Sequence, residues 1–191
     1  MEPLPPTAWA VLGLLSFGRE LSGYDLRKWA NASLRFFYGS PAMSQIYREL
    51  RRLEACGYVA SSATPPDEPR RKRLYRILPA GREALTAWLH DAPVEAPVLK
   101  HSVALRVWLG HLSDPATLRH TVEEHRAFAS RMADDVATAR AAAEDEPAWT
   151  YPALVERWGE RYWAGERDAA DALLADLDRL AADSSTGRRR R

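Results

Sequence analysis

The sequence predicts a mainly α-helical protein with two domains, and three observations support this prediction. Apolar residues recur at helical spacing along most of the 191 residues. Residues 1–90 hold 13 Lys and Arg against 8 Asp and Glu, a net charge of +5, whereas residues 91–183 hold 10 against 18, a net charge of −8. A proline-bounded segment separates these halves. We therefore expect a basic domain at residues 1–91, a linker at 92–97, an acidic helical domain at 98–183 and a basic disordered tail at 184–191.

Two short helices are expected first in the basic domain. From Thr7 to Phe17, apolar residues such as Leu12 and Leu15 share one face. Ser22 and Asp25 have the spacing of a capping box at the start of the second helix, which continues through Leu34.

A third helix is expected from Ser40 to Gly57, with Ser40 as its N-cap and Pro41 in the first turn. Its core stripe contains Ile46, Leu50 and Leu53. The opposite face is polar and carries Ser44, Gln45, Arg48, Arg51 and Arg52. Arg and Gln form bidentate hydrogen bonds with guanine and adenine in the major groove. A solvated helix with arginines on its outer face is the alternative interpretation.

A basic β-hairpin is expected after this helix. Residues 58–63 and 74–78 have strand composition, and the segment between them is rich in proline. Arg70, Arg71, Lys72 and Arg73 follow the loop and suit contacts with phosphates or the minor groove. Charges that protect a sheet edge from aggregation are the alternative. Three helices followed by such a hairpin predict a winged helix-turn-helix.

The basic domain resembles PadR-family transcriptional regulators over residues 7–90. The resemblance rests on the order and spacing of Val11–Leu15, Ser22–Leu26, Gln45–Glu54, Gly57–Val59 and Arg73–Ile77, which runs on to Gly81. Leu78 stands where family members often have a capping Thr, and Ser44-Gln45 replaces a common Pro-Gly pair, as in the longer subgroup with a virulence-activator-like C-terminal region. The resemblance implies a dimeric regulator that binds double-stranded DNA, and planar or phenolic effectors in some members. We expect DNA contacts from Tyr24, Ser44, Gln45, Tyr47, Arg48, Arg52, Arg70, Arg71, Lys72 and Arg73.

The acidic domain is predicted to form an antiparallel helical hairpin that dimerises. A helix at residues 81–91 is expected to end the basic domain. In the acidic domain a helix is expected at residues 98–112, and a long helix starts at Ser113-Asp114-Pro115. One apolar seam on the long helix and another on a helix at residues 153–180 have coiled-coil spacing. The first seam comprises Leu118, Val122, His125, Ala129, Met132, Val136, Ala139 and Ala143; the second comprises Val155, Trp158, Tyr162, Gly165, Ala169, Leu173, Leu177 and Leu180. Apolar surface left over would pack against a second copy.

Aromatic residues concentrate in the acidic domain and are candidate walls of a site for a planar effector. The candidate effector-binding residues are Trp108, His125, Trp158 and Tyr162, and ordinary core or dimer packing is the alternative for each of them. His125 is expected to hydrogen-bond across the helical interface, with a pH-dependent role left open. Oxidation of Cys56 at the end of the third helix is also left open.

The sequence favours a cytoplasmic, dimeric winged-helix regulator, more in keeping with a repressor than an activator. No histidine or cysteine spacing suggests a metal site, no catalytic constellation or cofactor motif is present, and no apolar run is long enough to span a membrane. No secretory signal is expected. A winged-helix adaptor that binds proteins rather than DNA is the second hypothesis, and an enzyme is the third.

Overall fold

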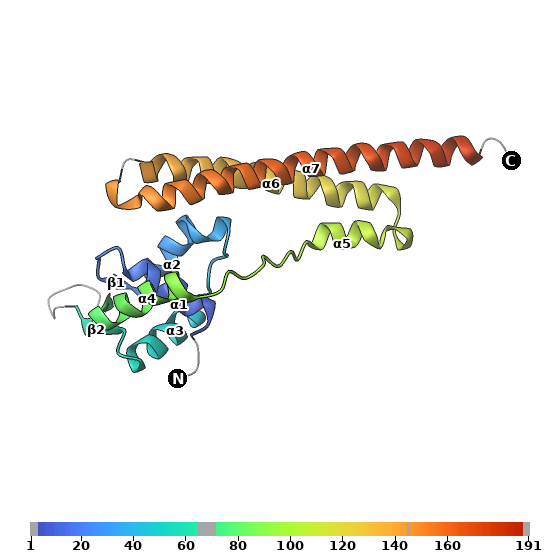
Figure 1. Cartoon of the computed structure of the whole chain (residues 1–191). Helices are drawn as coiled ribbons and strands as arrows, with labels where there is room; N and C mark the ends of the chain where they lie inside the picture. The colour runs from blue at the N-terminus through green and yellow to red at the C-terminus, as the bar shows by residue number, and fades with distance from the viewer. Residues whose placement is uncertain (1–3, 65–71, 145, 189–191) are drawn as a thin grey trace. The chain divides into compact units, whose positions relative to one another are not determined.

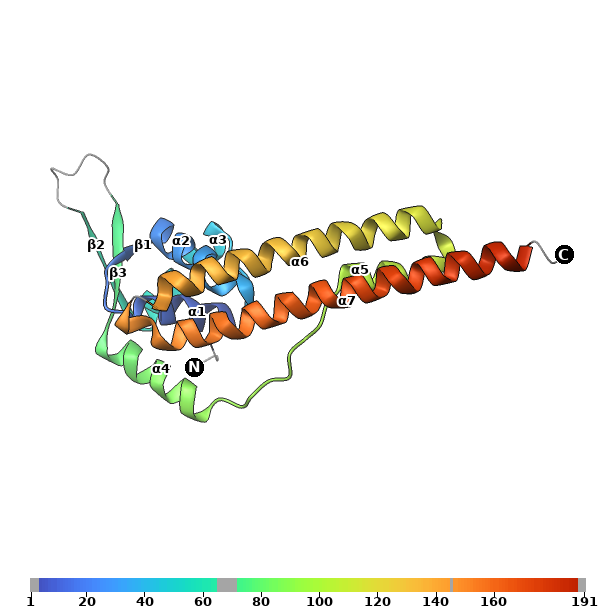
Figure 2. The ribbon, with the colours of Figure 1, turned by 90° about the horizontal axis from the view of Figure 1, so that it is seen from above.

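The computed structural model describes residues 4–64, 72–144 and 146–188, without the side chains of residues 184–188. The chain divides into two compact units, Met1–Glu95 and Ala96–Arg191. The division falls inside the segment that the sequence analysis treats as a linker. Each unit is described here by itself (Figures 1 and 2).

The first unit holds the four helices that the sequence predicts in it. They are α1 (Pro6–Leu15), α2 (Gly23–Ala32), α3 (Met43–Ala55) and α4 (Pro79–Asp91), with a 3₁₀ turn at Leu34–Phe36. The predicted capping box at the start of α2 is confirmed, because the Asp25 backbone N–H donates to Ser22 Oγ and the Ser22 N–H donates to the Asp25 carboxylate. Pro79 begins α4 without a side-chain cap. Proline is acceptable there because the first N–H groups of a helix have no partner within it.

The predicted start of α3 is wrong by two residues. Ala42, not Ser40, is the N-cap residue, and the helix begins at Met43. The side-chain oxygen of Gln45 accepts a hydrogen bond from the Ala42 N–H at 2.8 Å, so the cap comes from within the first turn of the helix. The predicted end is confirmed. Gly57 has φ +72° directly after the C-cap, the left-handed conformation that glycine adopts most readily.

A small antiparallel sheet completes the winged helix. Strands β1 (Leu21–Ser22), β2 (Val59–Ala63) and β3 (Arg73–Ile77) lie in the order β1-β3-β2. The hairpin register pairs Val59 with Ile77 and Ala63 with Arg73. Figure 2 shows β2 and β3 extending away from the helices of this unit. Sequence analysis missed β1, since two residues are too few to show an alternating pattern.

The core of the first unit lies between the helices and the inner face of the sheet. Leu12, Leu15, Leu26, Leu50 and Leu53 are all fully buried. The α4 helix packs so closely that a Cβ at Gly81 would lie 2.3 Å from the backbone oxygen of Tyr58. The rings of Trp9 and Trp88 stack at 5.4 Å and tie α1 to α4. These contacts fix the orientation of α3, since α1 and α2 pack against its inner face.

Helices are the only regular secondary structure among the described residues of the second unit. It contains α5 (Ser102–Trp108), α6 (Pro115–Glu144) and α7 (Thr150–Arg188), with 3₁₀ turns at Gly110–Leu112 and Pro147–Trp149. The predicted helix over residues 98–112 is shorter than expected, because His101 caps its start through an N–H···Nδ1 bond from Ala104. Asp114 caps α6 by accepting from the Thr117 N–H. Figures 1 and 2 show α6 and α7 side by side as the predicted hairpin.

The seam predicted for α6 faces α7, but the seam predicted for α7 is wrong from Val155 to Ala169, where its residues are exposed. Its later residues Leu173 and Leu177 do pack against the buried cluster of this unit. Along α6, Val122, Ala129 and Val136 are fully buried. Along α7, the predicted positions Trp158 and Tyr162 are exposed by 54% and 38%. The residues that α7 buries are Ala153, Glu156, Gly159, Ala170 and Leu174. Small residues at the contact let the two helices approach closely, and this register turns the large aromatic side chains outward.

Among the described residues, no helix combines the length and the apolar character that spanning a bilayer would require.

Candidate nucleic-acid interface

The outward face of α3 carries the polar side chains that the sequence predicts there. Ile46, Leu50 and Leu53 are buried at 1%, 0% and 0% exposure, which fixes the rotation of the helix. The opposite face presents five exposed side chains to solvent: Ser44, Tyr47, Arg48, Arg51 and Arg52. Gln45 is only half-buried, and its side-chain oxygen is already engaged by the Ala42 N–H. Its amide group therefore retains donors for an external partner but has lost part of its accepting capacity.

Glu49 lies on the same helix and was not predicted as a site residue. Its side chain is 1% exposed, yet each carboxylate oxygen accepts a hydrogen bond from an arginine on the outer face. Arg48 Nε lies 2.9 Å from Glu49 Oε1, and Arg52 Nη1 lies 2.9 Å from Glu49 Oε2. A buried carboxylate thus holds two of the arginines that were predicted to contact DNA.

Tyr47 is supported by the start of α2. A Cβ placed on Gly23 would lie 2.7 Å from the Tyr47 ring, so the ring occupies the space that any other residue at position 23 would need. Tyr24, the next residue along α2, is 69% exposed. The sequence-predicted residues Tyr24 and Tyr47 therefore come from neighbouring parts of α2 and α3.

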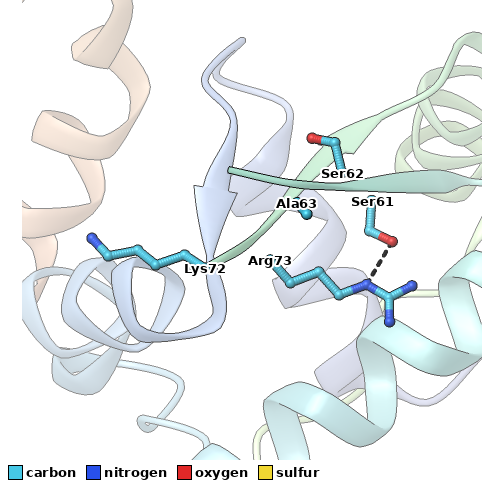
Figure 3. Close-up of a pocket in the computed structure, with 5 residues that line it drawn as sticks. All are labelled: Ser61, Ser62, Ala63, Lys72 and Arg73. Carbon is cyan, nitrogen blue, oxygen red and sulfur yellow. Dashed lines mark hydrogen bonds between the residues drawn. The ribbon is translucent and has the colours of Figure 1, made fainter. Parts of the chain in front are cut away.

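Lys72 and Arg73 are the described residues of the predicted basic run on the hairpin, and their side chains differ in their contacts. Arg70 and Arg71 lie outside the described residues. Lys72 is exposed, and its backbone N–H donates to Thr64 Oγ1 at 3.0 Å, which closes the described end of the hairpin. Figure 3 shows the Lys72 side chain extending away from that of Arg73. A shallow surface pocket of about 490 Å³ is lined by Ser61, Ser62, Ala63, Lys72 and Arg73.

Arg73 links the hairpin to α3. Its Nε donates to Ser61 Oγ at 2.7 Å (Figure 3), and Nη2 lies 3.2 Å from Glu54 Oε1 on α3. Ser61 Oγ in turn donates to Glu54 Oε1 at 2.5 Å. Because its guanidinium makes these contacts within the chain, Arg73 serves to couple the wing to α3. Its role in contacting DNA stays a prediction.

Three of the four candidate effector residues lie together in the second unit. Trp158 and Tyr162 stack with ring centroids 5.6 Å apart. Tyr162 and His125 both hydrogen-bond to Glu166, His125 with an Nε2–Oε2 distance of 3.1 Å. This confirms the predicted hydrogen bond of His125 across the helical interface. Trp108, on α5, is 78% exposed and is not part of this stack.

Sequence analysis missed the partners of His125. His101 Nε2 also lies 3.1 Å from Glu166 Oε2, so one carboxylate joins the segment before α5 to α6 and α7. Burial acts to raise the pKa of Glu166, but hydrogen bonds from His125, His101 and Tyr162 outweigh it and lower the pKa. Burial, followed by the neighbouring Glu166 charge, raises the pKa of Tyr162.

The same three groups are the described residues that could be considered for a metal ion. The donor atoms of His101, His125 and Glu166 all lie within 4.8 Å of one another. A neutral imidazole that binds a metal through Nε2 carries its proton on Nδ1. His101 Nδ1 instead accepts the Ala104 N–H at 3.1 Å, which requires its lone pair there and a proton on Nε2. The arrangement therefore fits two imidazoles donating to a carboxylate better than a metal centre.

The fold and the polar face of α3 define a winged helix-turn-helix protein. Residues 11–87 match the Transcriptional regulator PadR-like family. The family match confirms, over these residues, the resemblance to PadR-family transcriptional regulators drawn from the sequence. Membership of the subgroup with a virulence-activator-like C-terminal region stays a prediction.

Relatives with known sequence or structure agree with this family. The negative transcriptional regulator PadR of Bacillus subtilis is 37% identical over 81 residues, which are 42% of this chain and 43% of that protein. The sequence match therefore spans less than half of the relative's length.

Solved structures match over most of the chain. The PadR-like regulator from Bacillus cereus has a TM-score of 0.76 at 22% identity and covers 91% of this chain and 98% of its own. Bacillus subtilis PadR in complex with operator DNA has a TM-score of 0.74 at 21% identity, over 91% and 99% of the two chains. The same protein in complex with p-coumaric acid scores 0.68 at 21% identity, over 90% and 98%. At these identities the structures establish the shared fold.

Proposed function

We propose that this chain is a dimeric repressor that binds an operator in double-stranded DNA through α3 and the basic wing. The observation that carries the proposal is the outer face of α3, where Ser44, Arg48 and Arg52 are exposed above a fully buried apolar stripe. A helix with this polar face fits the major groove, in which arginine forms bidentate contacts with guanine. Such a regulator would act in the cytoplasm.

We assign different contacts to the two ends of α3. Ser44, Tyr47 and Arg48 lie in its first half and are the candidates for contacts with bases, together with the amide donors of Gln45. Arg51 and Arg52 follow one turn later and are assigned to phosphates, as is Lys72 on the wing. The Bacillus subtilis PadR structure with operator DNA supports this use of the shared fold.

Dimerisation is assigned to the second unit. The α7 helix exposes an apolar stripe at helical spacing, which comprises Tyr151, Leu154, Val155, Trp158 and Tyr162. Leu105 and Trp108 on α5, and Leu112 in the 3₁₀ turn that follows it, are also more than half exposed. Apolar surface of this extent on helices usually marks an interface between proteins. A two-fold dimer would carry two α3 helices and would favour an inverted-repeat operator.

A small planar or phenolic effector is the proposed release signal. Trp158 and Tyr162 offer a stacked aromatic wall, and His125 lies on the opposite helix of the hairpin with Tyr162 and Glu166. Bacillus subtilis PadR has been crystallised with p-coumaric acid, which supports an effector of this chemical class. An aromatic ligand at this wall would alter the packing of α7 and thereby the separation of the two α3 helices.

Salt dependence of DNA binding tests the proposal against the adaptor hypothesis. A dimer that contacts six to ten phosphates should lose on the order of 10³-fold or more in affinity for the fragment upstream of its own gene between about 50 and 200 mM salt. Arg48→Ala should reduce discrimination between operator and unrelated DNA, whereas Lys72→Ala should weaken binding to both equally. Absence of a salt-sensitive shift would contradict the proposal and favour the adaptor.

A further inference from the structure

Glu49 is the one charged residue on the buried side of α3. The whole residue is 0% exposed, although it lies on the helix that we assign to DNA contact. Removing a carboxylate from water costs several kcal/mol unless charged partners compensate for it. Its partners in the structure are Arg48 and Arg52, whose side chains remain 58% and 43% exposed. The carboxylate is therefore buried beneath two arginines that face solvent.

The geometry restricts what each guanidinium can offer to DNA. Nε of Arg48 donates its hydrogen bond to Glu49 Oε1. The two terminal nitrogens of Arg48 are therefore the donors left for an outside partner. Nη1 of Arg52 likewise donates to Glu49 Oε2. A guanidinium held at one nitrogen loses much of its rotational freedom before it meets a base. Because bidentate recognition of guanine needs two donors in a fixed orientation, this restriction favours specificity.

The charge of Glu49 has no evident benefit for either stability or general attraction to DNA. Buried ion pairs can often be replaced by apolar residues of similar volume without loss of stability. A negative charge next to the DNA-contacting face also opposes attraction to phosphates, which supplies most non-specific affinity. We propose that Glu49 is a positioning residue that sets base specificity by orienting Arg48, with Arg52 as its second partner. This inference rests on the proposed function.

The test measures a specificity ratio. The ratio compares the dissociation constants of the full-length dimer for a scrambled duplex and for the segment protected upstream of its own gene. Glu49→Gln should lower the ratio about 10-fold, within the discrimination that one bidentate arginine provides. At the same time, affinity for the scrambled duplex should stay equal or rise, since one negative charge is lost. Glu83→Gln is the control, because Glu83 is an exposed residue of α4 that loses the same charge.

A double-mutant cycle shows whether the effect passes through Arg48. Adding Glu49→Gln to Arg48→Ala should leave the ratio nearly unchanged, because the side chain that Glu49 orients is already gone. Circular dichroism and thermal melting would verify that each variant folds. Glu49→Met, which fills a similar volume without charge, gives the same readout if the Gln variant does not fold.

An unchanged ratio in a folded Glu49 variant would overturn the inference, and so would an undiminished effect in the Arg48→Ala background. A wild-type protein that binds both duplexes equally, or neither, would overturn the proposed function instead. The two failures are therefore distinguishable.

Discussion

Substitution of Trp158 by alanine should weaken self-association strongly. Trp158 is 54% exposed on α7, and a tryptophan contributes up to roughly 250 Å², so on the order of 130 Å² awaits a partner in each protomer. At about 25 cal/mol per Å², covering this area stabilises a dimer by about 3 kcal/mol per protomer. In a two-fold dimer both protomers carry the substitution, so the loss of association free energy is doubled. Even if only half of this value is realised, the dissociation constant should rise about 100-fold.

Sedimentation equilibrium over a wide range of protein concentrations would measure this change. Tyr24→Ala is the matched control, because Tyr24 is 69% exposed but lies on α2 in the first unit. The control should lose a similar aromatic area without changing the dissociation constant of the dimer. A Trp158→Ala protein that dissociates at the same concentration as the wild type would refute the assignment of this face to dimerisation.

Two further predictions concern the scaffold that holds α3. Gly81→Ala should lower the free energy of unfolding by about 1–3 kcal/mol, because its Cβ would lie 2.3 Å from the Tyr58 oxygen; Gly13→Ala, with no neighbour within 4 Å, should instead stabilise α1 by up to about 1 kcal/mol. Hydrogen bonds from Ser22 hold the pKa of Asp25 below its ordinary value of 3.8. A lowered carboxyl pKa adds stability above that value and loses it as the pH falls below, so the destabilisation caused by Asp25→Asn should be full at pH 7 and shrink below pH 3.8. Urea unfolding would measure both effects. A free energy of unfolding of Gly81→Ala equal to that of the wild type, or a pH-independent effect of Asp25→Asn, would contradict them.

The first unit could be predicted well because its signals are local. The capping box of Ser22 and Asp25, the apolar stripe of α3 and the left-handed Gly57 each depend on residues within a few positions of one another. The start of α3 was misplaced because Ser40 and Pro41 have good N-terminal chemistry, while the actual cap is the side chain of Gln45 bonding to the Ala42 N–H.

The second unit could be predicted only in outline. Both long helices were expected, but two faces of α7 have helical spacing, one rich in large aromatic residues and one in small residues. The choice between them depends on how closely α6 approaches, and Gly159 and Ala170 permit a close contact that Trp158 would prevent. Periodicity assigns apolar residues to a face but does not indicate whether a helix of the same chain or another protomer covers it.

The contacts of Glu166 and of Glu49 could not be predicted from sequence patterns for a related reason. His101 and Glu166 are 65 positions apart, so their contact exists only after the hairpin and α5 have packed. Glu49 was placed among neither the core nor the polar residues, because a carboxylate is rarely buried without compensation. Its position between Arg48 and Arg52 on the helix was a usable signal, since i, i+3 pairs of opposite charge lie close together.

Footprinting on the DNA upstream of the gene tests the central claim most directly. If a dimer inserts two α3 helices into successive major grooves, hydroxyl-radical cleavage should be suppressed in two segments on one side of the duplex, with centres about one helical turn, or 10 base pairs, apart. Both segments should lose protection together as the salt concentration rises. Uniform cleavage at protein concentrations that saturate any binding, or protection of a single segment that does not respond to salt, would contradict the account.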